Sequence, residues 1–110
     1  MNQFERARDL RQLRFMRSTL LAYESGSSSL PRLIEDLEEL LLSLSDENPD
    51  WRDQFRKAWS VLEERYTLLL ERGQDDVDAA STAMTGQAVQ RLKDLVDGEI
   101  ARRERDHPGA

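Results

Sequence analysis

The 110-residue chain contains no cysteine, which excludes disulfides and thiolate metal sites. Its single histidine, His107, lies three residues from the end, where fraying is expected to keep it from acting as a general base. The chain has no G-x-S-x-G elbow and no glycine-rich phosphate loop. We therefore expect a protein that is not an enzyme, with no catalytic residue, no cofactor and no metal.

Strand-forming residues and long apolar runs are also scarce. Valine and isoleucine together occur six times, with three prolines and five glycines, and this composition argues against a sheet. No apolar run reaches the roughly 18 residues of a membrane span, and the N-terminal sequence MNQFERARDL lacks the apolar region of a signal peptide. We expect an all-α protein that does not enter a membrane and resides in the cytoplasm.

Negative charge exceeds positive charge, with a formal net charge of −6. A protein that binds nucleic acid over a wide surface should be basic, because phosphate affinity comes largely from lysine and arginine. An acidic chain favours a basic protein partner instead. The apolar residues are strongly periodic, so we expect one folded domain over residues 1–105 and a frayed tail at 106–110.

Apolar residues at three- and four-residue steps predict helices at about 4–23, 30–44, 49–72 and 87–103. The spacing of Val77, Ala80 and Met84 also allows the last helix to begin near Asp76, whereas Thr85-Gly86 could interrupt it, so residues 74–86 remain open between helix and loop. Short connections predict an antiparallel up-down four-helix bundle; a three-helix core with a loosely attached first helix is the alternative. The expected inner faces are Leu10, Leu13, Met16, Leu20 and Tyr23; Leu30, Leu33, Ile34, Leu37, Leu40, Leu41 and Leu44; Trp51, Phe55, Ala58, Trp59, Leu62, Tyr66 and Leu69; and Val89, Leu92, Leu95, Val96 and Ile100.

Arginines recur along the first predicted helix, interleaved with Glu5 and Asp9. No aromatic side chain is placed to stack a base between them. We expect these arginines to pair with the acidic face of a neighbouring helix or within their own helix. The set comprises Arg6, Arg8, Arg11, Arg14 and Arg17.

The pair Glu35-x-x-Glu38 resembles the magnesium-binding pairs of all-helical nucleotide pyrophosphatases. A hard cation needs carboxylates that converge from more than one element. The second acidic pair, Glu63 and Glu64, has no acidic residue four positions on. Because Glu35 and Glu38 flank the apolar stripe without interrupting it, a solvated face is the favoured interpretation.

Acidic residues are segregated between Glu35 and Asp53, where eight of them stand against a single basic residue, Arg52. Asp50 and Asp53 lie in a predicted first turn, where the helix dipole favours anions. The carboxylates of the second helix have no such local cause, so an ordinary acidic face and a binding surface both remain open. The candidate partner-binding residues are Glu35, Asp36, Glu38, Glu39, Leu42, Asp46, Glu47, Asp50 and Asp53.

Residues 10–72 resemble a known group of proteins in their arrangement of helices and in their composition. The resemblance lies in three stretches, LRFMRSTLLAYESG, SLPRLIEDLEELLLSL and WRDQFRKAWSVLEERYTLLLERG. In architecture the chain resembles the small acidic all-helical immunity proteins of bacteria, of the colicin D and contact-dependent growth inhibition types. The resemblance implies that the chain binds a cationic toxin domain, often a ribonuclease, and covers its basic cleft with carboxylates.

A helical adaptor or homodimeric scaffold is the competing hypothesis. Leu42, Leu68, Leu70 and Phe15 lie off or at the margin of the predicted inner stripes and could form a second interface. A scaffold should self-associate through such residues and tolerate loss of the acidic set. A metal-dependent nucleotide pyrophosphatase is a distant third hypothesis.

Overall fold

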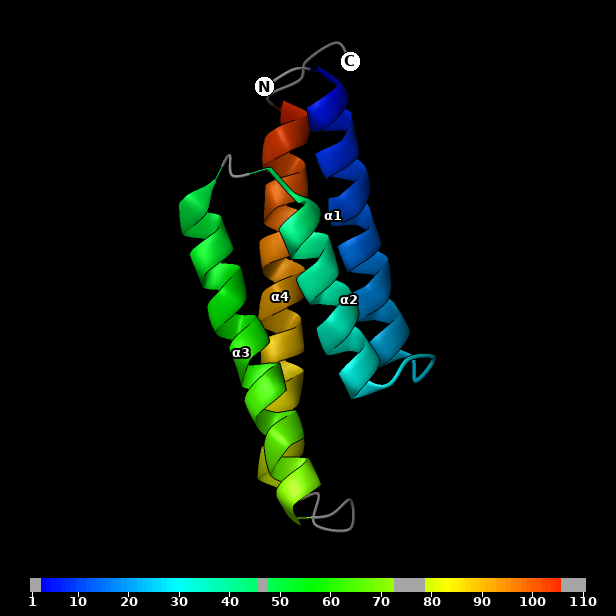
Figure 1. Cartoon of the computed structure of the whole chain (residues 1–110), viewed down its shortest axis with the longest axis vertical. Helices are drawn as coiled ribbons and strands as arrows, with labels where there is room; N and C mark the ends of the chain where they lie inside the picture. Colours follow the sequence, from blue (N-terminus) through cyan, green and yellow to red (C-terminus); the bar gives the residue numbers. More distant parts are fainter. Residues whose placement is uncertain (1–2, 46–47, 73–78, 106–110) are drawn as a thin grey trace.

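Four helices close into a bundle in the computed structural model, which describes residues 3–45, 48–72 and 79–105 (Figure 1). These segments contain no strand, and their helices are α1 (Gln3–Glu24), α2 (Leu30–Ser43), α3 (Pro49–Arg72) and α4 (Ala79–Arg105). Each helix packs against the next, and α4 packs back against α1. The predicted all-α, antiparallel up-down four-helix bundle is confirmed. The alternative with a loosely attached first helix is wrong, because α1 contacts both α2 and α4.

The helix ends form where the turn and capping residues predict them. Gly26 has a φ of +85°, which glycine adopts at little cost, and it lies two residues after the end of α1. The hydroxyl of Ser29 accepts a hydrogen bond from the backbone N–H three residues later and caps α2. The side-chain oxygen of Asn48 accepts the N–H of Trp51 in the same way at α3.

The possible interruption at Thr85-Gly86 does not occur, because α4 runs unbroken from Ala79. A Cβ added at Gly86 would meet no atom within 4 Å, so the glycine fills no packing need. Its cost in a helix is about 1 kcal/mol, which the burial of Val89 and Leu92 outweighs. The clearer of the two predicted starts was thus too late; the earlier one, near Asp76, and the predicted frayed tail lie outside the described residues.

The core contains residues of all four helices, among them the predicted leucine stripe of α2 and the aromatic residues of α3. Leu33 and Leu37 are fully buried, as is Phe55. The two tryptophans of α3 also connect it to its neighbours. The indole N–H of Trp51 donates to the carbonyl of Leu95 in α4 at 2.7 Å, and that of Trp59 donates to the carbonyl of Ile34 in α2 at 2.9 Å. These bonds fix α3 against both adjacent helices.

The two halves of the bundle differ in length. α2 has 14 residues and α3 has 24, which correspond to about 21 and 36 Å. Accordingly α3 and α4 extend beyond the α1–α2 hairpin at one end (Figure 1), and there Leu70 and Met84 are 64% and 43% exposed. Within the described ranges, the helices lack an apolar stretch of the length needed to cross a membrane.

Leu37 and Leu42 provide a matched pair on one helix, since the first is fully buried and the second is 63% exposed. We expect Leu37→Ala to lower the free energy of unfolding by about 3 kcal/mol, because it leaves a cavity in the core. Leu42→Ala should change it by less than about 0.5 kcal/mol. Urea denaturation of both variants measures the difference. Equal losses would contradict the burial described for α2.

Candidate functional site

The outer face of α2 carries most of the predicted acidic site. Glu35, Glu38, Glu39 and Leu42 are exposed, opposite the buried leucines of the same helix. In the described part of the chain, none of these three glutamates has an ion-pair partner. Asp36 lies at the α1 side of this face, where Arg32 approaches it at 3.7 Å. The structure therefore gathers three unpaired carboxylates and one apolar side chain on a single helix face.

Asp50 and Asp53, the remaining predicted carboxylates that the structure describes, do not join this face. Arg52 donates to the carbonyl oxygens of Leu44, at 2.9 Å, and Ser45, at 3.4 Å, so it faces the end of α2. Successive helical residues are turned by about 100°, which directs Asp50 and Asp53 to other sides of α3, where both are exposed. Arg52 thus separates the acidic residues of α2 from those of α3. Asp46 and Glu47 lie outside the described residues.

Charges along the contact between α1 and α4 are paired instead. Arg14 contacts Glu104 at 3.0 Å, and Arg17 contacts Asp97 at 2.9 Å. For Arg14 and Arg17, these contacts confirm the expected pairing with an acidic residue of a neighbouring helix. Each pair is half exposed and contributes only about 0–1 kcal/mol. Their significance is the contrast with the outer face of α2, where Arg32 approaches Asp36 but Glu35, Glu38 and Glu39 have no ion-pair partner among the described residues.

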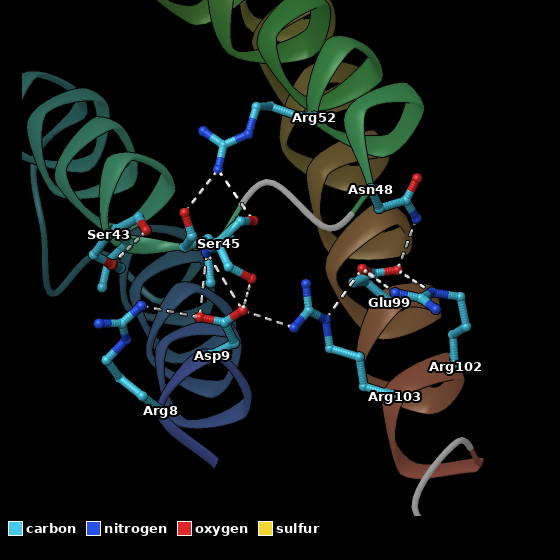
Figure 2. A network of polar contacts seen from close by, with 11 residues as sticks. Arg8, Asp9, Ser43, Ser45, Asn48, Arg52, Glu99, Arg102 and Arg103 are labelled. Carbon is cyan, nitrogen blue, oxygen red and sulfur yellow. Dashed lines mark hydrogen bonds and ion pairs between the residues drawn. The ribbon is translucent and has the colours of Figure 1, made fainter. Parts of the chain in front are cut away.

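A buried polar network joins three parts of the chain at one end of the bundle (Figure 2). Asp9 of α1 is fully buried. Its carboxylate accepts hydrogen bonds from the backbone N–H of Ser45, at 3.3 Å, and from the Ser45 hydroxyl. It also accepts a hydrogen bond from Arg103 of α4 at 2.8 Å. The Asp9 carboxylate thereby joins α1 to α4 and to the segment that follows α2.

Glu99 continues the network on α4 and is only 2% exposed. Arg102 donates to both of its carboxylate oxygens, at 2.8 and 2.9 Å, and Arg103 donates at 3.1 Å. The amide of Asn48, the residue that caps α3, donates at 3.3 Å (Figure 2). Burial by itself would raise the pKa of Glu99, but these two arginines outweigh burial and lower it.

Sequence reasoning missed this network, since Asp9 was assigned to the charged surface of the first helix. The signal was present in the spacing. Asp9 precedes the buried Leu13 by four residues, while Glu99 and Arg103 follow the buried Val96 by three and seven. All three occupy core positions of their helices. When one helix has a carboxylate at a core position and another helix has an arginine at a core position, the two side chains are expected to form a buried pair.

The end of α1 borders a small cavity of about 240 Å³, which Tyr23, Leu69, Thr85 and Val89 help to line. Burial raises the pKa of the Tyr23 hydroxyl.

Within residues 3–45, 48–72 and 79–105, no three carboxylate or histidine side chains converge as a metal site requires. Comparisons with protein-family models, with curated proteins and with solved structures find no match to this chain.

The lowered pKa of Glu99 predicts a specific pH dependence of stability. A carboxylate whose folded pKa lies below its unfolded value, about 4.3 for glutamate, stabilises the fold fully above that value. The stabilisation is lost as the pH falls through the folded pKa. We expect Glu99→Gln to lower the free energy of unfolding by about 3 kcal/mol at pH 7. The difference from the parent protein should shrink towards pH 3.

Urea denaturation at pH 7 and pH 3 tests this expectation, with the exposed Glu63→Gln as the matched control. The control should change stability by less than about 0.5 kcal/mol at pH 7. A loss for Glu99→Gln that is the same at both pH values would show that ionised Glu99 is not stabilised by its arginine neighbours.

Proposed function

We propose that this protein is a non-enzymatic inhibitor of the immunity type, which binds and neutralises a cationic bacterial toxin domain through the outer face of α2. The observation that carries the proposal is the uneven pairing of charge. Exposed carboxylates between α1 and α4 have arginine partners, whereas Glu35, Glu38 and Glu39 have none among the described residues. The resemblance of residues 10–72 to such inhibitors agrees with this assignment.

The physical basis is the repulsion among the carboxylates of α2. Glu35 and Glu39 are four residues apart on one helix face, where like charges repel. A basic partner removes this repulsion and is steered by the acidic field during encounter. Leu42 lies beside Glu38 and Glu39 on the same face and offers an apolar contact that excludes water. Asp50 and Asp53 lie on other sides of α3 and are not part of this face.

The partner that fits this face is a basic nuclease-like domain whose cleft accepts phosphates, because carboxylates on a rigid helix can occupy the same cleft. The proposal includes a cytoplasmic location, where such a domain would meet its nucleic acid. It also predicts that salt slows association, since exposed charges are screened beyond about 10 Å at 0.1 M ionic strength.

Affinity capture from a lysate of the source organism, with elution by rising sodium chloride, tests the proposal. The parent protein should retain one basic nuclease-like domain and inhibit its activity. The triple variant Glu35→Lys, Glu38→Lys, Glu39→Lys should bind that domain at least about tenfold more weakly. The matched control Glu63→Lys, Glu64→Lys, Glu71→Lys has the same net charge, changes exposed residues of α3, and should bind as the parent does.

Equal affinity of both triple variants for the captured domain would reject the α2 face as the binding surface.

A homodimeric scaffold is the second candidate, favoured by the exposure of Phe15, at 60%, and of Leu70, at 64%. Leu68, which the scaffold hypothesis also placed at the second interface, is half-buried. Sedimentation across a range of concentrations separates the two candidates, because a scaffold self-associates whereas the inhibitor stays monomeric until its partner is added.

A further inference from the structure

A groove lies between α1 and α2, on the outside of the bundle beside the acidic face. It has a volume of about 310 Å³, and the ring of Phe15 and the side chain of Leu40 form its apolar part. Asp36 and Glu39 line it from α2, and Gln12 lines it from α1. The groove therefore combines an apolar surface with two carboxylates.

Phe15 is the unusual member of this groove. Its ring is 60% exposed, although it lies on the helix whose Leu13 and Met16 are fully buried. The neighbouring Leu40 is partly buried against the core, so Phe15 has an apolar side chain beside it while more than half of its own surface is open to solvent. An exposed aromatic ring of this kind is available to a side chain from another molecule.

The charge of the groove selects the kind of side chain. Glu39 has no ion-pair partner among the described residues. Among the described residues, Asp36 is approached only by Arg32, at 3.7 Å, in a pair whose side chains are 75% (Arg32) and 40% (Asp36) exposed, and such a pair exchanges at little cost. No basic residue lines the groove; Arg11, one turn before Phe15, is exposed on α1. A cation that enters the groove thus meets two carboxylate groups.

We infer that this groove receives an arginine side chain of the basic protein partner, with the guanidinium stacked on Phe15 and hydrogen-bonded to Glu39 and Asp36. The planar guanidinium suits both contacts, since it stacks on aromatic rings and donates in a fork to carboxylates. The aliphatic part of the arginine would cover Leu40. This inference rests on the proposed function, because it specifies one contact of the partner with the α1–α2 side of the acidic face.

A peptide of defined chemistry tests the groove without the natural partner. The probe is a 12-residue peptide with four arginines separated by glycine and serine, and the comparison peptide has lysine in place of each arginine. Addition of the arginine peptide to the isotopically labelled full chain should shift the amide resonances of residues 12–19 and 36–43. The lysine peptide should bind at least twofold more weakly, since it cannot stack or donate in a fork.

Two variants and two matched controls locate the contact. Phe15→Ala and Glu39→Gln should each weaken the arginine peptide about three- to tenfold. Phe4→Ala removes a ring that is 78% exposed elsewhere on α1, and Glu64→Gln removes an exposed carboxylate of α3; both should bind as the parent does. All four positions are exposed, so the variants are expected to fold.

Unchanged affinity in Phe15→Ala, or equal affinity for both peptides, would overturn the inference. Self-association that Phe15→Ala abolishes would also overturn it, because a second copy would then occupy the groove. The result is distinguishable from failure of the proposed function. If the captured toxin domain is lost in the α2 triple variant but retained by Phe15→Ala, the groove is wrong and the function stands. If the arginine peptide binds as predicted but the lysate yields no basic partner, the function fails and the groove stands.

Discussion

The buried contact between Asp9 and Arg103 is the constraint on which the arrangement of this bundle depends. Both side chains are removed from water, with exposures of 0% and 7%, and a buried charge is costly unless it is paired. Asp9 also accepts the backbone N–H of Ser45, so the same contact holds the chain as it leaves α2. Apolar side chains allow helices to slide or rotate slightly, whereas this directional contact favours the register of α1, α2 and α4 that brings Asp9 to Ser45 and Arg103.

That register determines which surfaces remain for a partner. The second carboxylate of the network, Glu99, receives the amide of Asn48, and Asn48 caps α3. The start of α3 is thereby fixed relative to α4, while Arg52 fixes it relative to the end of α2. With α1 and α4 neutralising each other along their contact, Glu35, Glu38 and Glu39 remain as a group of unpaired carboxylates on the outer face of α2, and further exposed carboxylates without a partner among the described residues lie on α3. A rigid acidic face of this kind suits recognition of a preformed basic surface.

Periodicity predicted the four helices and most of the core, because apolar side chains at helical spacing have few other places to go. Capping residues such as Ser29 and Asn48 predicted the helix starts for an equally local reason. Gly86 misled the prediction of α4, since tertiary packing overrides a weak local preference. The placement of Asp53 away from α2 was also hidden, because it depends on how α3 is rotated against its neighbours, and the exposure of Phe15 beside Glu39 depends on how α1 meets α2.

The larger error of the sequence-based prediction was to assume that charged side chains lie on the surface. Asp9 and Arg103 have polar side chains at core positions, and composition alone assigns them to solvent. They are separated by 94 residues in sequence, so no local pattern reveals that they meet. Their partners compensate the cost of burial, and this compensation is a property of the folded chain. The candidate face of α2 was found from sequence because its charges are close together on one helix.

A double-mutant cycle between Asp9 and Arg103 tests this account most directly. The free energies of unfolding of the parent, Asp9→Ala, Arg103→Met and the double variant are measured by urea denaturation at pH 7. The account predicts that each single variant leaves a buried charge without its main partner, so the double variant should be more stable than additivity requires by about 2 kcal/mol or more. Additive losses, with a coupling near zero, would contradict the claim that this contact holds the bundle in register.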